Sequence, residues 1–179
     1  MSNKTASQRH RHVVELCVFA MLGAVMFASK IIMEALPNIH LLGMLIMAYT
    51  VAFRTKALIP IYLFVFLTGI YGGFAPWWVP YLYVWAVLWG LTMLIPPRLP
   101  RRVRLVIYPL ICALHGFAFG VLYAPAQALL FGFNTEQTLA WIASGLPFDL
   151  IHGISNLVCG CLVLPFSELL MRLMRKSRG

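Results

Sequence analysis

Three polar side chains late in the chain are spaced so that one face of a helix would carry all of them. Asp149, His152 and Asn156 follow one another at i, i+3 and i+7 within an otherwise apolar segment, which places them on a single helical face. A carboxylate, an imidazole and an amide can bind a polar ligand, move a proton or hydrogen-bond to a neighbouring helix. Gly145 and Pro147 precede them, so we expect an opened helix start whose free N–H groups could also receive a polar ligand.

Two other interpretations of this polar face stay open. It could be an internal lock of hydrogen bonds, with His115 as a partner from the preceding helix, or an intramembrane enzyme site that uses Asp149, His152 and His115. No metal site is predicted, because these residues and Cys159 follow no strong metal-ligand spacing. The sequence has no G-x-x-x-x-G-K-[ST], G-x-S-x-G or H-E-x-x-H motif, so we assign no catalytic residue and expect no ATP hydrolysis by this chain alone.

A second polar group surrounds the expected end of the first apolar segment. Lys30 and Glu34 are one helical turn apart and can form an ion pair, either as functional charges or as side chains that extend to the nearby interface. Asn38 is expected to cap the next helix, and His40 places an imidazole at its start. All four are candidate substrate contacts.

Aromatic residues gather around the start of the fourth apolar segment. Most should anchor the chain at the membrane interface, and one or two could line the mouth of a pocket, because flat amphipathic rings suit large conjugated ligands. The candidates for substrate contact here are Trp78, Tyr81 and Tyr83.

The composition indicates which elements position these residues. The chain has 179 residues, of which 61% are hydrophobic and 11% charged, and its mean hydropathy is +0.86. A bilayer can solvate that much apolar surface while each helix satisfies its own backbone hydrogen bonds, so we predict a single all-α integral membrane domain over residues 1–179. The net charge of +9 lies in short basic clusters between apolar runs, so nucleic acid is not an expected partner.

Six apolar segments are expected to span the membrane, with a bend near Pro125 in the fifth. Residues 72–78 are predicted to be an interfacial loop, and residues 132–145 the longest polar connection. No cleavable signal peptide is predicted, because the first apolar run is too long and lacks a small-residue cleavage site. The expected spans are residues 13–35, 39–53, 57–71, 79–95, 103–131 and 146–173.

The basic residues orient these spans. With six spans, the clusters before the first, between the second and third, between the fourth and fifth, and after the sixth all fall on one side. Lys and Arg are retained in cytoplasmic loops, so both termini are predicted to be cytoplasmic. The clusters include Lys4, Arg9, Arg11, Arg54, Lys56, Arg98, Arg101, Arg102, Arg104, Arg172, Arg175, Lys176 and Arg178.

A stripe of small residues runs along the first span. Ala20, Ala24 and Ala28 repeat every fourth residue, and such stripes let another helix approach closely inside lipid. The approaching helix could belong to this chain or to a partner.

This stripe, the following segment Met33-Glu-Ala-Leu-Pro-Asn-Ile-His-Leu-Leu-Gly43, the six short spans and the basic ends resemble the S components of energy-coupling factor (ECF) transporters. The resemblance implies a multi-pass protein of the bacterial plasma membrane that binds a vitamin with high affinity from outside. It also implies docking through the alanine face onto a membrane T component, with two cytoplasmic ATPases using ATP to power import. No covalent cofactor and no catalytic activity of the chain itself are implied.

The resemblance is strongest to the cobalamin-type S component of lactic acid bacteria, so a corrinoid is the first substrate expectation. Folate, riboflavin, pantothenate, pyridoxine and queuosine binders share the scaffold and remain alternatives. A purely structural subunit would bind no small molecule.

Overall fold

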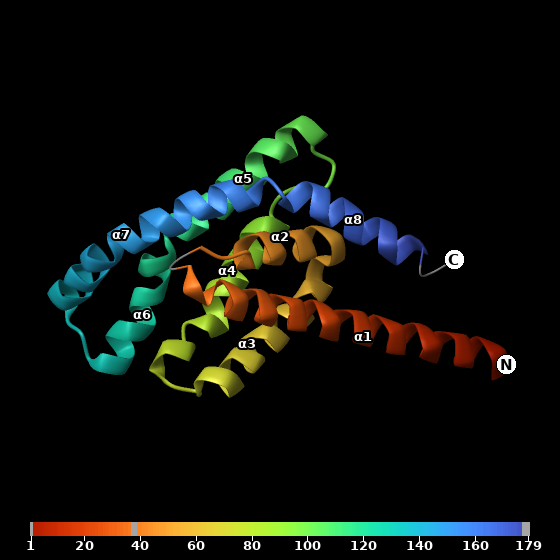
Figure 1. The fold of residues 1–179 in the computed structure, drawn as a ribbon, viewed down its shortest axis with the longest axis horizontal. Coiled ribbons are helices and arrows are strands. Elements are labelled where there is room, and N and C mark those ends of the chain that lie inside the picture. Colours follow the sequence, from red (N-terminus) through yellow and green to blue (C-terminus); the bar gives the residue numbers. More distant parts are fainter. Residues whose placement is uncertain (1, 37–38, 177–179) are drawn as a thin grey trace.

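The computed structural model describes residues 2–36 and 39–176, and this part of the chain is all-helical with no strand, which confirms the all-α part of the prediction (Figure 1). Four stretches are long and apolar enough to cross a membrane: His12–Ala35, Leu42–Gly72, Arg101–Phe131 and Thr135–Gly160. The helices are α1 Ser2–Ile32, α2 Leu42–Phe53, α3 Leu58–Gly72, α4 Tyr81–Met93, α5 Arg101–Phe117, α6 Phe119–Phe131, α7 Thr135–Gly160 and α8 Val163–Lys176, with short 3₁₀ turns η1 Met33–Ala35, η2 Arg54–Ala57 and η3 Pro76–Trp78.

Several expected boundaries are corrected. The first expected span, residues 13–35, agrees with the apolar stretch His12–Ala35, and α1 extends beyond it to begin at Ser2. The connection predicted at residues 132–145 is mostly helical, because Asn134 caps α7 and exchanges hydrogen bonds with Gln137 in a capping box, a sequence signal for a helix start. Pro147 therefore lies inside α7, and the opened helix start expected there does not exist.

The fifth and sixth segments are each divided into two helices. The fifth breaks at Ala118, between α5 and α6, and not near Pro125, which lies inside α6. The sixth breaks at residues 161–162, between α7 and α8. The break at Ala118 matters for function, because a new helix start exposes backbone N–H groups in the middle of the chain.

The core is built around α2. Its residues Leu42–Thr50 are all buried, as expected for a helix that is apolar on every side, and it contacts α4, α5, α7 and α8. The most extensive contact between two helices is that of α5 with α7, which lie side by side (Figure 1). A Cβ on Gly116 of α5 would lie 2.9 Å from backbone atoms of Gly153 on α7, so only glycine permits this backbone approach.

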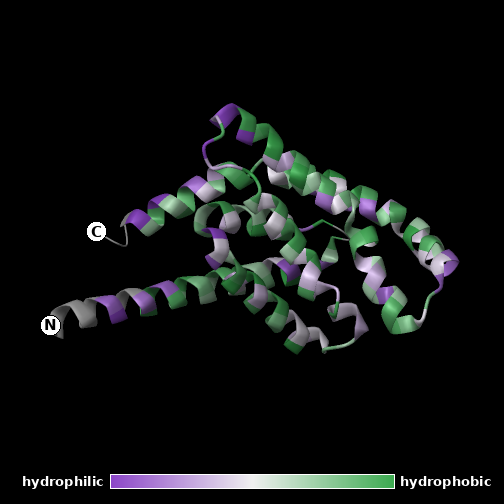
Figure 2. Ribbon diagram, turned by 180° about the vertical axis from the view of Figure 1, so that it is seen from behind, coloured by the Kyte–Doolittle hydropathy of each residue, from purple (hydrophilic) through white to green (hydrophobic). Residues whose placement is uncertain are grey.

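Hydrophobic residues make up much of most helices (Figure 2), and many large ones are exposed. Large side chains such as Leu129, Leu94 and Ile32 are 85%, 78% and 78% exposed. Together with the four long apolar stretches, this exposure of large apolar side chains indicates an integral membrane protein.

Cationic contacts tie several helices together at one end of the bundle. Arg54 donates to the carbonyl of Met93 at 3.0 Å, and Lys56 pairs with Glu15 of α1 at 2.6 Å. The start of α5 is joined to α8 by a 3.3 Å ion pair between Arg101 and Glu168. The start of α1 and the end of α8 also lie on one side of the molecule (Figures 1 and 2).

Candidate functional site

The carboxylate of Asp149 caps the start of α6. The backbone N–H of Gly120 donates to both of its oxygens, at 3.1 and 3.0 Å, and Asp149 is only 6% exposed. A negative charge is favourable at a helix N-terminus, where N–H groups lack partners within the helix. A Cβ on Gly120 would lie 2.4 Å from Oδ2 of Asp149, so glycine is required for the carboxylate to approach.

Asn156 and His115 make further contacts between helices. Nδ2 of Asn156 donates to the carbonyl of Cys112 on α5 at 3.2 Å, and Nε2 of His115 donates to the carbonyl of Val84 on α4 at 3.0 Å. Asp149 and Asn156 therefore form hydrogen bonds between helices, as the lock interpretation predicts. His115 also links two helices, but its partner is on α4 and not on α7.

His152, the third member of the predicted face, has different surroundings. It is 3% exposed. Its ring packs edge-on against His40, with 4.4 Å between centroids, and at a tilt against Phe119, with 4.8 Å between centroids. Phe119 also contacts His115 at 6.2 Å and Trp85 at 5.7 Å. We call His40, Trp85, His115, Phe119 and His152 the histidine cluster.

Four nitrogens in the histidine cluster are buried without a hydrogen-bond partner among the described residues. They are Nδ1 of His40, Nε1 of Trp85, Nδ1 of His115 and Nε2 of His152. Buried polar atoms are nearly always paired, and each one left alone is costly. These four unpartnered nitrogens make the histidine cluster the candidate place for a polar ligand.

A chain of aromatic rings connects the histidine cluster to the connection between α3 and α4. Trp77 contacts Tyr81 at 5.7 Å, and Tyr81 contacts Trp85 at 5.3 Å. The Tyr123 hydroxyl donates to the carbonyl of Trp77, which joins this end of α4 to α6. Flat ligands could pack against these rings.

The remaining predicted site residues lie at the edge of the cluster or outside it. Lys30 and Glu34 form the expected ion pair at 3.0 Å. Lys30 lies near His40, and Glu34 lies near Tyr81.

Two predicted aromatic contacts instead link segments of the bundle. Trp78 donates to the carbonyl of Val65 at 2.8 Å, and Tyr83 donates to the carbonyl of Leu122 at 2.7 Å. Asn38 lies outside the described residues.

Phe119 and the backbone of Gly120 were missed as parts of the site. The sequence analysis identified His115, four residues before Phe119, as a candidate partner of the polar face. It did not predict the helix break at Ala118. Trp85 was not among the predicted substrate contacts, whereas it is 1% exposed and its indole N–H has no partner among the described residues.

The alanine stripe lies on the exposed face of α1. Ala20, Ala24 and Ala28 are all exposed, whereas Phe19 and Gly23 are buried on the face that packs against α3, where Gly23 adjoins Leu63. In this structure the stripe is therefore not packed against another described helix of the chain.

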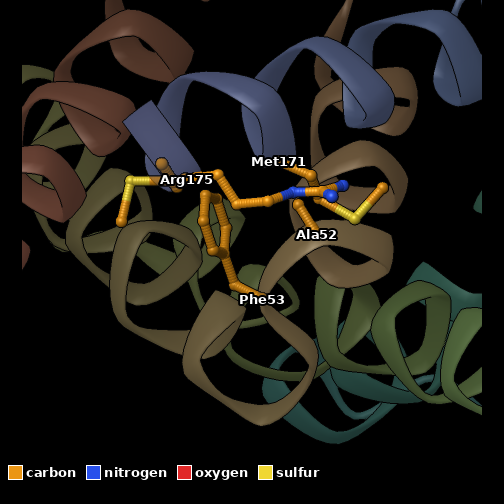
Figure 3. Close-up of a pocket in the computed structure, with 5 residues that line it drawn as sticks. Ala52, Phe53, Met171 and Arg175 are labelled. Atoms are coloured by element: carbon orange, nitrogen blue, oxygen red, sulfur yellow. The ribbon is translucent and has the colours of Figure 1, made fainter. Parts of the chain in front are cut away.

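A hollow of about 200 Å³ lies between the end of α2 and α8, lined by Ala52, Phe53, Met171, Met174 and Arg175 (Figure 3). It is at the cationic end of the bundle, next to Arg54, and far along α2 from the histidine cluster. It does not belong to the candidate site.

No family model, curated protein or solved structure matches this chain.

Proposed function

We propose that this chain is the high-affinity substrate-binding subunit of an ECF-type importer for a vitamin. The observation that carries the proposal is the histidine cluster, in which four buried nitrogens lack partners among the described residues. A purely structural subunit would gain stability by pairing or replacing such atoms, whereas a binding protein needs them for its ligand.

The proposed arrangement in the membrane has six spans, with both termini in the cytoplasm of a bacterium. The separation of charged and aromatic ends supports it. Arg54, Lys56 and Arg101 make their contacts at one end of the bundle, as expected for a cytoplasmic face. Trp77 and Tyr123 meet at the other end, and Tyr123 stacks on Trp141 at 6.0 Å, as in an aromatic belt.

Docking would use the exposed alanine stripe. Inside lipid, helices associate where small residues let backbones approach closely, and Ala20, Ala24 and Ala28 present such a surface, exposed among the described helices. In this proposal the stripe receives a membrane T component, and two cytoplasmic ATPases on that component hydrolyse ATP to drive import.

The enzyme alternative receives less support. General acid–base catalysis needs groups within hydrogen-bond reach of each other or of a substrate. Both oxygens of Asp149 instead accept from Gly120, and no hydrogen bond joins Asp149 to His152 or His115 within the described residues.

The test is a thermal-shift and calorimetric titration of the detergent-solubilised chain. The panel contains cobalamin, the substrate that the resemblance favours, together with folate, riboflavin, pantothenate, pyridoxine and queuosine. One vitamin should raise the unfolding temperature in a concentration-dependent way, because a ligand that binds only the folded state stabilises it. The proposal fails if every compound leaves the unfolding temperature unchanged and the chain shows no heat of binding.

A further inference from the structure

The donors and acceptors of the histidine cluster specify what a ligand must present. Nε2 of His115 already donates to the carbonyl of Val84, so in a neutral imidazole Nδ1 is left as an acceptor. Nε1–H of Trp85 is a donor only, and the two rings are 5.9 Å apart between centroids, with an angle of 35° between their planes. A ligand edge that satisfies both must therefore carry a donor beside an acceptor.

The ring geometry specifies the shape. Trp85, Phe119 and Tyr81 form a group of aromatic faces and edges at 5.3 to 5.7 Å, which favours stacking or edge contacts with another flat ring. His152 contacts Phe119, and His40 contacts His152; each has one unpartnered nitrogen that can serve as donor or acceptor. The site thus offers hydrogen bonds around the rim of a flat group.

The charges specify what a ligand must lack. The cation nearest the cluster, Lys30, is already paired with Glu34 at 3.0 Å, and the buried Asp149 adds a second carboxylate. Arg54 and Arg101 lie at the opposite end of the bundle. Among the described residues the cluster contains no Lys or Arg, so an anionic group brought into it would lose its hydration without a permanent cation to replace it, which is unfavourable in an apolar interior.

We propose that the cargo is a planar heteroaromatic compound without an anionic group, recognised through a ring edge that pairs a donor with an acceptor. This inference rests on the proposed function, because it identifies the substrate class of the same site. It narrows the alternatives toward compounds such as riboflavin and pyridoxine and away from folate, pantothenate and the bulky corrinoids.

The experiment compares matched compounds that differ by one phosphate. The full chain in detergent is titrated calorimetrically with riboflavin and flavin mononucleotide, with pyridoxine and pyridoxine 5′-phosphate, and separately with folate, pantothenate and cyanocobalamin. One uncharged member of a pair should bind at least about 100-fold more tightly than its phosphate ester, because the buried charge of the ester would stay unpaired.

Two variants test the site itself. Trp85→Phe and His152→Phe keep an aromatic ring but remove a nitrogen, and each should weaken binding of the uncharged compound by about tenfold. His12→Phe is the matched control, because His12 is exposed on α1 away from the cluster, and it should bind like the parent chain. The unfolding temperature of each variant without ligand shows whether it is folded.

The outcomes separate the two proposals. Binding of cyanocobalamin, folate, pantothenate or a phosphate ester in preference to the uncharged compounds overturns this inference and leaves the vitamin-binding function standing. Binding of an uncharged compound that neither folded cluster variant weakens also overturns it. If no compound binds at all, the proposed function and this inference both fail.

Discussion

Asp149 of α7 accepts hydrogen bonds from the backbone of Gly120 through both carboxylate oxygens, at 3.1 and 3.0 Å. Because Phe119 is the residue next to Gly120, this cap also fixes the phenyl ring against His152, one turn further along α7, with 4.8 Å between their centroids. One buried carboxylate thus positions the start of α6 and the centre of the histidine cluster together.

Gly120→Ala should destabilise the chain. The new Cβ would lie 2.4 Å from Oδ2 of Asp149, so the carboxylate or the helix must move, at a cost of about 1–3 kcal/mol. Thermal or denaturant unfolding in detergent measures the loss. Gly90→Ala is the control, because a Cβ at this helical position meets no atom within 4 Å; it should be neutral or stabilising by about 0.5–1 kcal/mol. Equal effects of both changes would refute the steric argument.

Asp149→Ala should lower stability more than Asp149→Asn. Alanine leaves the N–H of Gly120 without its acceptor, at a cost of about 1–2 kcal/mol, whereas asparagine keeps one oxygen that can accept the bond. Unfolding of both variants in the same detergent gives the difference. If Asn is as harmful as Ala, the negative charge and not the hydrogen bond carries the effect.

Ala24→Trp should abolish vitamin uptake in cells and leave ligand binding by the purified chain unchanged. Ala24 is exposed in the middle of the alanine stripe, and an indole there would hold the backbone of a docking helix away. Leu129→Trp is the matched control, since residue 129 is 85% exposed on α6 and should tolerate an indole in lipid. Normal uptake by the Ala24→Trp strain would exclude docking through this stripe.

Cysteines placed at opposite ends of the bundle test the proposed orientation. Thr135→Cys, at the exposed start of α7, should react with an impermeant maleimide added outside intact cells. Arg102→Cys, near the start of α5, should react only after the cells are opened. The parent chain, with its own four cysteines, gives the background. The reverse labelling pattern would mean that the basic end faces outward.

The sequence by itself determined the helical class, the membrane character and which residues are polar in an apolar setting. Composition favours the first two, because lipid solvates apolar side chains and a helix satisfies its own backbone hydrogen bonds there. Spacing decides local neighbours: Asp149, His152 and Asn156 do share a buried face, and Lys30 pairs with Glu34 one turn away.

The tertiary structure alone decided what these polar residues contact. The break at Ala118 follows no Pro or Gly signal at that residue, yet it creates the helix start that Asp149 caps. His40 and His152 stand 112 residues apart and meet only because α2 packs against α7. Contacts between distant segments depend on packing across the whole bundle, which local periodicity does not encode.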